Sequence, residues 1–416
     1  MNVARMRLID RWLGTPVCLL LTIWRTIWGR KFPAQDQKPR SILFIKLAEQ
    51  GSTVLAQRAL RSAVERVGRE KVYFLLFAEN RPILDLLDLI PRQNVIEIRA
   101  KGLLRTIIGA CSALYRMHRL GIEAVIDLEF FARSSASLSY LSGARWRVGY
   151  HAFGGEGSYR GNLMTHRLSF NPYLHTSQTF QIMVDALDHP AEQFPMFDLV
   201  PSTSESTGFQ LKFDSSETAV VQALLEKELG RSARKIILLN ANASDLMPLR
   251  RWPSDRYIEL ANLLLSQYPD CAIGFTGAPS EASAVDELVR KVNSPRCFNT
   301  AGKTNLRQLL ILYSLSEILV TNDSGPAHFA TLTNVEVVVL FGPETPKLFA
   351  ALSPRTHPLW AGLACSPCIN AFNDRNSSCR DNVCMKKISV DQVFEQVAEL
   401  YEKRQQQFGR GNRLAA

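Results

Sequence analysis

Short apolar runs alternate with longer amphipathic stretches through the first half of the chain, and this spacing predicts its elements. Five runs read as strands: Ser41–Leu47, Lys71–Ala78, Asn94–Ile98, Ala124–Glu129 and Arg145–Tyr150. The residues between them, such as 53–67, have the length and polarity of helices. Continuous apolar strands separated by helices are typical of a parallel sheet covered on both faces. The first half is therefore predicted to be a doubly wound α/β domain.

The same pattern restarts after a Ser- and Thr-rich stretch near residues 198–216. Five further strands are expected: Lys235–Asn242, Cys271–Gly277, Cys297–Ala301, Glu317–Asn322 and Val335–Gly342, with helices such as Ser254–Gln267 and Pro279–Val292. We divide the chain into a front segment 1–37, two Rossmann-like domains 38–205 and 206–390, and a C-terminal segment 391–416. That last segment should hold a helix to about Arg404 and a disordered tail. Two such domains facing across a cleft would bind ligands at the carboxyl ends of their strands.

The basic charge of the chain is concentrated at its front end. The whole chain has 49 Lys and Arg against 39 Asp and Glu, a net charge of +10, and residues 1–40 contribute eight basic and two acidic residues. A nucleic-acid-binding protein is expected to have a basic body with interleaved aromatic residues instead. A basic end segment favours contact with an anionic membrane surface, and no nucleic-acid partner is expected.

An apolar run lies within this basic segment, from Trp12 to Trp28. Its 17 residues span about 26 Å as a helix, short of the ~30 Å hydrocarbon core, and Arg25 interrupts it. No small-residue cleavage site follows, which disfavours a removable signal peptide. We predict an N-terminal membrane-associating helix, in the plane of the membrane or hairpin-like, with the rest of the protein at the cytoplasmic face. A single-span anchor and a helix packed on the protein are the alternatives.

The segment Val320–His328 (VTNDSGPAH) carries the first candidate ligand chemistry, because a predicted strand ends there and a helix begins. The N–H groups of Ser324 and Gly325 would point out of the helix start, where a phosphate can bind. Asp323 can accept hydrogen bonds from sugar hydroxyls. The alternative is that Asp323 and Ser324 only cap the helix.

A second candidate segment follows the first strand of the second half. Its arginines, Arg250 and Arg251, can give charge-assisted hydrogen bonds to a diphosphate, with Ser244 in the same loop. Glu281 ends the next strand–loop unit, where a ribose can bind. A solvent-facing arginine pair is the alternative. The chain contains no D-x-D pair, so arginines and helix-end N–H groups, and no catalytic cofactor, are expected to neutralise a leaving nucleotide.

These motifs together resemble glycosyltransferase family nine, the ADP-heptose:lipopolysaccharide heptosyltransferase group, over about residues 41–395. The motifs that carry the resemblance are Ile42–Leu47 with Gly51, Arg250–Pro253 (RRWP), Thr321–His328 (TNDSGPAH), Leu340–Pro343 (LFGP), Cys365–Cys368 (CSPC) and Cys384–Met385. The resemblance implies a GT-B fold with an N-terminal acceptor domain and a C-terminal nucleotide-sugar domain. It also implies that Arg250 contacts phosphate, and that Asp323, Ser324 and Gly325 contact the donor. His328 matches the histidine of the motif.

The activity implied by the resemblance is inverting transfer of a heptose-like sugar from an ADP-heptose-like nucleotide-diphospho-sugar. The acceptor would be a lipopolysaccharide or another surface-glycan or lipid-linked molecule. The protein would be located at the cytoplasmic face of a bacterial inner membrane. Two alternatives come from other classes of protein. One is a catalytically silent nucleotide-sugar-binding or scaffold subunit, and the other a sugar-nucleotide epimerase, since similar folds host such enzymes.

The first loop departs from the family pattern. The family usually reads S-x-G-D there, with the Asp as catalytic base, and this chain has Ser52 at that position. A serine hydroxyl is too weak a base to accept the acceptor's proton unaided. Glu49, three residues earlier in the same loop, is our candidate base. Asp127 and Glu129 at another strand end are the alternatives.

The eight cysteines fall into two groups. Cys18, Cys111, Cys271 and Cys297 are expected to be ordinary small hydrophobic residues. The others form two closely spaced pairs: Cys365 with Cys368, and Cys379 with Cys384. This spacing is that of a four-thiolate structural zinc site, although free thiols and disulfides remain alternatives.

Overall fold

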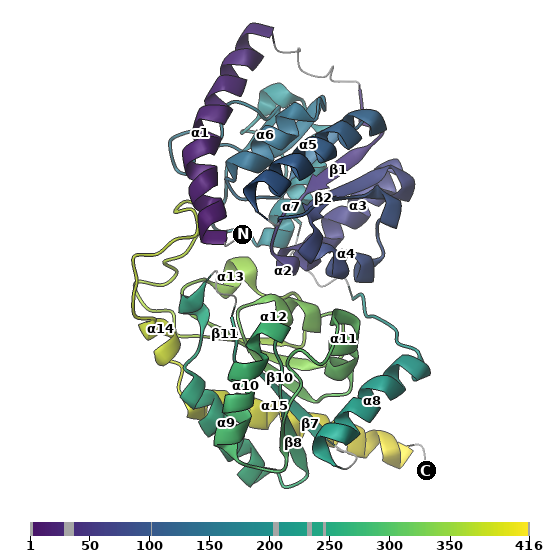
Figure 1. Cartoon of the computed structure of the whole chain (residues 1–416), viewed down its shortest axis with the longest axis vertical. Coiled ribbons are helices and arrows are strands. Elements are labelled where there is room, and N and C mark those ends of the chain that lie inside the picture. The colour runs from purple at the N-terminus through teal and green to yellow at the C-terminus, as the bar shows by residue number, and fades with distance from the viewer. Residues whose placement is uncertain are drawn as a thin grey trace. The chain divides into compact units, whose positions relative to one another are not determined.

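A computed structural model describes residues 3–28, 37–100, 102–202, 208–230, 235–243 and 247–414. The chain folds into two compact units (Figure 1). The first comprises Met1–Ser204 together with a short remote segment, Ile369–Ser377. The second comprises Glu205–Cys368 and Ser378–Ala416. Each unit is built on one six-stranded sheet.

The sheet of the first unit is wholly parallel, with the strand order β3-β2-β1-β4-β5-β6. Its strands are β1 (Ile42–Ile45), β2 (Val72–Phe77), β3 (Val95–Ile98), β4 (Ala124–Asp127), β5 (Trp146–Tyr150) and β6 (His166–Leu168). All four residues of β1 are fully buried, which explains its unbroken apolar sequence. The strand order reverses between β1 and β4, and ligands of such sheets bind at the carboxyl edge of that point.

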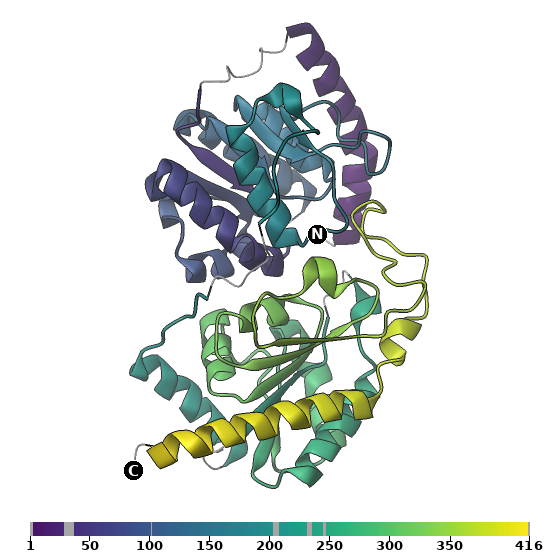
Figure 2. The ribbon, with the colours of Figure 1, turned by 180° about the vertical axis from the view of Figure 1, so that it is seen from behind.

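Helices cover both faces of this sheet: α2 (Gln50–Leu55), α3 (Gln57–Val67), α4 (Arg81–Leu87), α5 (Leu103–Leu120), α6 (Arg133–Leu141) and α7 (Thr176–Asp185). On one face, Ala113 and Met117 of α5 and Leu138 of α6 share a buried cluster with Leu43 and Ile45 of β1. On the other face α3 packs against α7 (Figure 2). The sheet is thus buried on both sides, as its apolar strands predict.

A further helix, α1 (Val3–Trp28), packs along α6 on the first of these faces (Figure 1). Its Asp10 carboxylate accepts hydrogen bonds from the first backbone N–H groups of α6, those of Arg133 (3.1 Å) and Ser134 (2.8 Å). Asp10 therefore caps α6 from outside, satisfying donors that a helix start otherwise leaves unpaired.

Residues one helical turn apart continue this contact along α1. Cys18 is fully buried, and its thiol lies 3.6 Å from the Arg133 carbonyl. Thr22 Oγ1 accepts from the backbone N–H of Asn162 (2.9 Å), and Arg25 donates to the Met164 carbonyl (3.0 Å). Arg25, which interrupts the apolar run, therefore lies on the face of α1 that packs against the first unit. Within the described residues, no helix combines the length and apolarity needed to cross a bilayer. The contacts of Asp10, Cys18, Thr22 and Arg25 are those that the packed-helix alternative predicts for one face of α1.

The second unit repeats the same topology, with the strand order β12-β11-β10-β7-β8-β9 and parallel pairing throughout. Its strands are β7 (Lys235–Asn240), β8 (Cys271–Phe275), β9 (Cys297–Asn299), β10 (Ile318–Asn322), β11 (Glu336–Phe341) and β12 (Thr356–Trp360). Here the order reverses between β7 and β10. Both predicted ligand segments follow these two strands.

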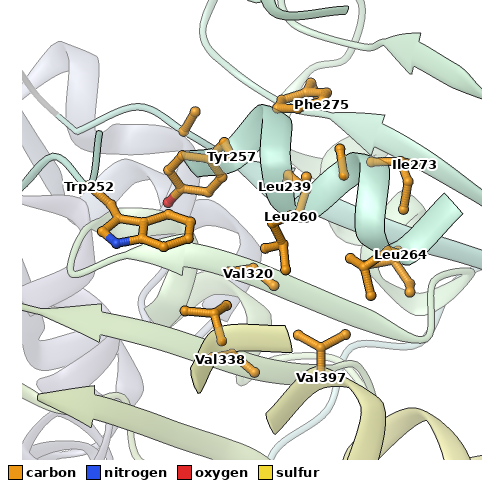
Figure 3. Close-up of a cluster of buried hydrophobic side chains, with 14 of the residues drawn as sticks. Leu239, Trp252, Tyr257, Leu260, Leu264, Ile273, Phe275, Val320, Val338 and Val397 are labelled. Atoms are coloured by element: carbon orange, nitrogen blue, oxygen red, sulfur yellow. The ribbon is translucent and has the colours of Figure 1, made fainter. Parts of the chain in front are cut away.

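The helices of the second unit are α8 (Ser215–Leu229), α9 (Ser254–Gln267), α10 (Ala282–Val292), α11 (Leu306–Ser314), α12 (Gly325–Ala330), α13 (Pro346–Phe349), α14 (Val383–Lys386) and α15 (Val390–Leu414). A buried cluster joins α9 and α15 to the central strands; it contains Trp252, Tyr257, Leu260 and Val397 (Figure 3). The last helix, α15, crosses the back of the sheet (Figure 2). It continues past Arg404 to Leu414, so the helix is longer than the sequence predicted.

Candidate functional site

The carboxyl edge between β1 and β4 in the first unit is organised by the buried ammonium group of Lys46, which is only 1% exposed. Its Nζ lies 2.9 Å from Glu129 Oε2 and 3.3 Å from Glu49 Oε2. Burial acts to lower the pKa of Lys46, but the two carboxylates outweigh it and raise that pKa. Glu129 Oε1 also accepts from the backbone N–H of Leu47 (2.7 Å). The loop after β1 is therefore held rigidly.

Glu49 lies in this loop, immediately before α2, and Ser52 Oγ lies 3.2 Å from its carboxylate. The Glu49 side chain keeps 26% of its surface exposed. Ser52, at the position of the family's usual aspartate, thus contacts the candidate base. Arg375 contacts the same carboxylate, through an ion pair with Glu49 Oε1.

Arg375 comes from the remote segment Ile369–Ser377, which we call the arm. Phe372 of the arm packs edge-on against Phe170, with ring centroids 5.1 Å apart, and lies 6.3 Å from Phe131. Asp374 accepts a hydrogen bond from Ser158 of the first unit. The arm is thus an integral part of the first unit, although more than 160 residues separate it from the rest of that unit's sequence.

Unusual backbone conformations concentrate here. Six non-glycine residues in the described chain have positive φ, and four of them belong to this site: Glu49 (71°), Phe131 (31°), Asp374 (54°) and Arg375 (56°). Such a conformation costs about 1–3 kcal/mol per residue and persists only where surrounding contacts enforce it. Because strained residues cluster at functional sites, this gathering marks the carboxyl edge of β1 as one.

The two alternative bases are less suited to proton transfer. Asp127 is completely buried; its carboxylate pairs with Arg160 and accepts a 2.8 Å hydrogen bond from Ser135. Burial raises the pKa of Asp127, while Arg160 acts against the shift. Glu129 is occupied by Lys46 and by the backbone of the β1 loop. Glu49 is therefore the acid in this group with the most exposed side chain.

In the second unit, the segments after β7 and β10 meet through Arg250. Its Nη1 donates to the Asp323 carbonyl (3.1 Å), and its Nε lies 3.6 Å from Asp323 Oδ2. The same guanidinium forms an ion pair with Glu344, which is 1% exposed. Sequence analysis missed Glu344, although its place directly after Pro343 of the LFGP motif at the end of β11 was a usable signal. Two of the predicted donor residues, Arg250 and Asp323, are therefore in contact.

Asn322 fixes this arrangement from the end of β10. Its side-chain oxygen accepts from the backbone N–H of Trp252 (3.0 Å), and its amide nitrogen donates to the Ala241 carbonyl (3.2 Å). The Trp252 ring is buried and donates to the Ile388 carbonyl (2.9 Å). Asn322 and Trp252, both within the family motifs, thus hold the two ligand segments together rather than face a ligand.

Three other predicted donor residues have local partners, and one lies outside the described chain. Arg251 donates twice to the Ala243 carbonyl (3.1 and 2.9 Å), so it stabilises its own loop. Glu281 accepts from the Ala278 N–H (2.7 Å) at a short helical turn. Ser324 is the N-cap residue of α12, and its hydroxyl donates to the Asn322 carbonyl (3.1 Å). Ser244 lies outside the described residues.

The start of α12 leaves little room around Gly325. A Cβ added there would lie 3.0 Å from the Phe329 ring. His328, one turn further along, is only 7% exposed. The histidine of the motif thus belongs to the packed body of α12.

All eight cysteines are free thiols in the structure. Of the four cysteines predicted to be ordinary small hydrophobic residues, Cys18, Cys271 and Cys297 are buried and Cys111 is exposed. Of the other four, Cys384 is buried, Cys368 half-buried, and Cys365 and Cys379 exposed. Among the residues that the structure describes, no group of three or more His, Cys, Asp or Glu side chains is arranged to hold a metal ion. The four-thiolate zinc site stays a prediction.

Two doubly wound sheets, each with charged side chains at the point where its strand order reverses, define a two-domain α/β protein of the kind found in nucleotide-sugar-dependent glycosyltransferases. Solved structures share this fold. An Escherichia coli ADP-heptose lps heptosyltransferase II matches with a TM-score of 0.64 at 20% identity, over 88% of this chain and 99% of that one. A family 9 glycosyl transferase from Veillonella parvula matches with a TM-score of 0.66 at 18% identity, over 89% and 99%.

The chain belongs to glycosyltransferase family 9 (heptosyltransferase), whose family model matches residues 117–377. Among curated relatives, lipopolysaccharide heptosyltransferase 2 of Salmonella typhimurium is 30% identical over 135 residues, or 32% of this chain and 38% of that protein. Lipooligosaccharide heptosyltransferase 2 of Haemophilus influenzae is 26% identical over 163 residues, or 38% and 46%. The matched part of the chain thus spans less than half the length of these two relatives.

Proposed function

We propose that the protein is a metal-independent, inverting glycosyltransferase. It transfers a heptose-like sugar from an ADP-heptose-like nucleotide-diphospho-sugar to a lipopolysaccharide core or another lipid-linked glycan. The names of its curated relatives support a heptose as the transferred sugar and a lipopolysaccharide or lipooligosaccharide as the acceptor. The observation that carries the proposal is the Glu49 carboxylate, held at the carboxyl edge of β1 by Lys46 and Arg375.

In this mechanism Glu49 takes the proton from the acceptor hydroxyl as its oxygen attacks the anomeric carbon of the donor. The bond from the anomeric carbon to the diphosphate breaks, and the nucleoside diphosphate leaves with the bonding electrons. Arg250 is the candidate group to neutralise that charge. Its guanidinium would exchange the Glu344 carboxylate for the diphosphate, a substitution of one anion for another.

The test is a transfer assay with ADP-heptose and lipopolysaccharide cores truncated to no heptose or one heptose. Release of ADP should require both substrates. Glu49→Gln keeps the size and polarity of the side chain but removes the base, so turnover should fall by ~10²–10⁴ with unchanged donor affinity. Wild-type turnover in Glu49→Gln would refute the assignment of the base.

The same assay separates the alternative classes. Thermal stabilisation by ADP-heptose without any turnover would indicate a silent binding or scaffold subunit; ligand at ~100 Kd adds ~2.7 kcal/mol. Conversion of the donor alone to an isomer would indicate an epimerase. A gain of turnover in Ser52→Asp over the wild type would indicate that the natural loop had lost its base.

We further propose that the first unit lies on the cytoplasmic face of a bacterial inner membrane. The outer face of α1 supports this, because large apolar side chains on it are exposed: Leu8, Trp12, Leu13, Val17, Leu19, Leu20, Ile23, Trp24, Ile27 and Trp28. On the other side of α6, helix α5 exposes Leu103, Leu104, Ile107, Ile108, Tyr115 and Leu120 (Figure 1). These two helices carry 16 of the 25 exposed large hydrophobic side chains in the described chain, a concentration that suits a lipid surface.

The charges on these helices suit an anionic surface. Helix α5 contains three arginines and no acidic residue, and Arg105 and Arg119 are exposed. The only acidic residue of α1 is Asp10, which is engaged with α6. Basic residues beside exposed tryptophans favour the headgroup region of an anionic bilayer.

A further inference from the structure

The ion pair between Arg375 and Glu49 joins positions that are 326 residues apart. A pairing this remote forms only if the arm Ile369–Ser377 is seated in the first unit. Phe372 supplies the apolar part of that seat, where its ring packs with those of Phe170 and Phe131. The backbone N–H of Arg375 donates to the Asn370 carbonyl (3.0 Å), which closes the arm into a compact loop. The guanidinium is thereby delivered from a rigid support.

Arg375 supplies a second cation to the charged cluster around Glu49. Lys46 and Arg375 face the carboxylates of Glu49 and Glu129, so two cations meet two anions. The Arg375 side chain is only 12% exposed, and the ion pair is therefore weakly screened by water. Without Arg375, the Glu49 carboxylate would lose the cation at its Oε1, while Lys46 would still contact both carboxylates.

The backbone around the ion pair between Arg375 and Glu49 is conformationally strained. Asp374 and Arg375 both have left-handed φ, as does Glu49 on the other side of the ion pair. Each such residue costs about 1–3 kcal/mol. An arm that served only to cover the first unit would not need left-handed residues on both sides of one ion pair. The geometry is that of a device that fixes one carboxylate.

We propose that Arg375 is a positioning residue: its guanidinium holds the Glu49 carboxylate in the orientation needed to accept the acceptor's proton. This inference rests on the proposed role of Glu49 as base. A positioning residue acts through Glu49, so loss of Arg375 should lower kcat and leave the donor KM unchanged. A misplacement of about 1 Å at a reacting group can cost ~10²-fold in rate.

The test compares Arg375→Ala with Arg380→Ala, an exposed arginine five residues further on that serves as the matched control. With ADP-heptose and truncated lipopolysaccharide core, Arg375→Ala should lose about 10²-fold in kcat, and Arg380→Ala almost nothing. Added guanidinium ion should restore part of the loss in Arg375→Ala. Arg375→Lys should retain intermediate activity, because lysine keeps the charge but lacks the planar fork. If Arg375→Ala is unstable, the kcat of Arg375→Lys and the effect of added guanidinium ion decide whether Arg375 positions Glu49.

A double mutant separates positioning from general stability. In the Glu49→Gln background, Arg375→Ala should add little further loss and guanidinium should give no rescue, since the group to be positioned is gone. Full additivity of the two losses would overturn the inference. So would wild-type kcat in Arg375→Ala while Glu49→Gln is inactive, an outcome that leaves the proposed function intact. Wild-type kcat in Glu49→Gln would overturn both.

Discussion

His166, on β6, shows how burial sets the chemistry of a single side chain. It is 1% exposed; its Nδ1 lies 2.9 Å from Thr165 Oγ1 and its Nε2 lies 3.1 Å from the His189 carbonyl. Burial lowers the pKa of His166 to about 4, although the His189 carbonyl acts in the opposite direction, and Arg147 adds to the lowering. The folded protein therefore keeps this ring neutral at mildly acidic pH.

The consequence is a loss of stability in acid. Between the unfolded pKa near 6.5 and the folded pKa of about 4, only the unfolded chain binds the proton. Stability contributed by His166 is thus present above about pH 6.5 and is lost as the pH falls toward 4, by roughly 3 kcal/mol in total. Urea unfolding of His166→Gln should show a shallower pH dependence over this range than the wild type. An equal dependence of the unfolding free energy on pH in both proteins would contradict this role of His166.

At the level of residues, the strand-end rule predicted part of the site and missed the rest for a physical reason. Arg250 and Asp323 follow neighbouring parallel strands, so their contact could be expected from the sequence. Arg375 follows no strand and reaches Glu49 only through the path of the arm. Nothing local in the sequence encodes that path.

Helix α1 is held against the first unit by a close approach at Gly161. This residue has a φ of 68°, and an added Cβ would lie 2.3 Å from Thr22 Oγ1 and 2.7 Å from the Cys18 carbonyl oxygen. Gly161→Ala should therefore push α1 away and destabilise the protein by about 1–3 kcal/mol beyond the backbone strain. Gly155→Ala is the matched control, since Gly155 has a φ of 79° and nothing within 4 Å of its added Cβ. Similar thermal midpoints for the two variants would mean that the contact with α1 is unimportant.

The two cysteine pairs flank the arm directly. Cys368 immediately precedes it, and Cys379 follows it by two residues. A zinc ion held by four thiolates would fasten both ends of the arm. We predict about one zinc per chain in protein purified without chelator, and its loss in the Cys365→Ser, Cys379→Ser double variant. Cys111→Ser, an exposed cysteine elsewhere, is the control. Absence of zinc from the wild type would leave the free thiols as the correct description.

Among the elements, the sequence predicted all the interior strands and missed β6 and β12, one of the two edge strands of each sheet. Interior strands of a parallel sheet are covered on both faces, so their apolar runs are unbroken. β6 has an arginine at its centre, and β12 is only partly buried and contains Pro358. Edge strands tolerate such residues because one side of the backbone has no strand to pair with.

For helix α1, the apolar run was evident from the sequence. Its division into a docked and an exposed face was not, because that division depends on contacts with α6 and with the loop at residues 162–164.

At the scale of the molecule, the proposed membrane contact predicts a vesicle-binding pattern that follows two helices. Replacing Trp12, Trp24 and Trp28 with serine should weaken binding to phosphatidylglycerol vesicles in a flotation assay by at least about tenfold. A loss of only ~1.4 kcal/mol of binding free energy produces a tenfold change in affinity. Replacing Leu104, Ile108 and Tyr115 of α5 should also weaken it.

Serine at Val220 and Leu263, exposed apolar residues of the second unit, is the control and should leave binding unchanged. These variants keep Asp10, Cys18 and Thr22, so α1 stays docked; deleting the helix would instead uncover Ala136 and Met164. Equal flotation of all variants, or a change of oligomeric state in place of vesicle binding, would refute the lipid contact.

The arm also constrains how this protein can exchange parts with its relatives. A single breakpoint near residue 204 would join a foreign first unit to an arm that evolved with another one, leaving Arg375 and Phe372 opposite unmatched partners. A functional hybrid needs two exchanges, one for residues 1–204 and one for Ile369–Ser377. Natural exchange of the first unit alone is therefore expected to be rare, or to be accompanied by changes in the arm.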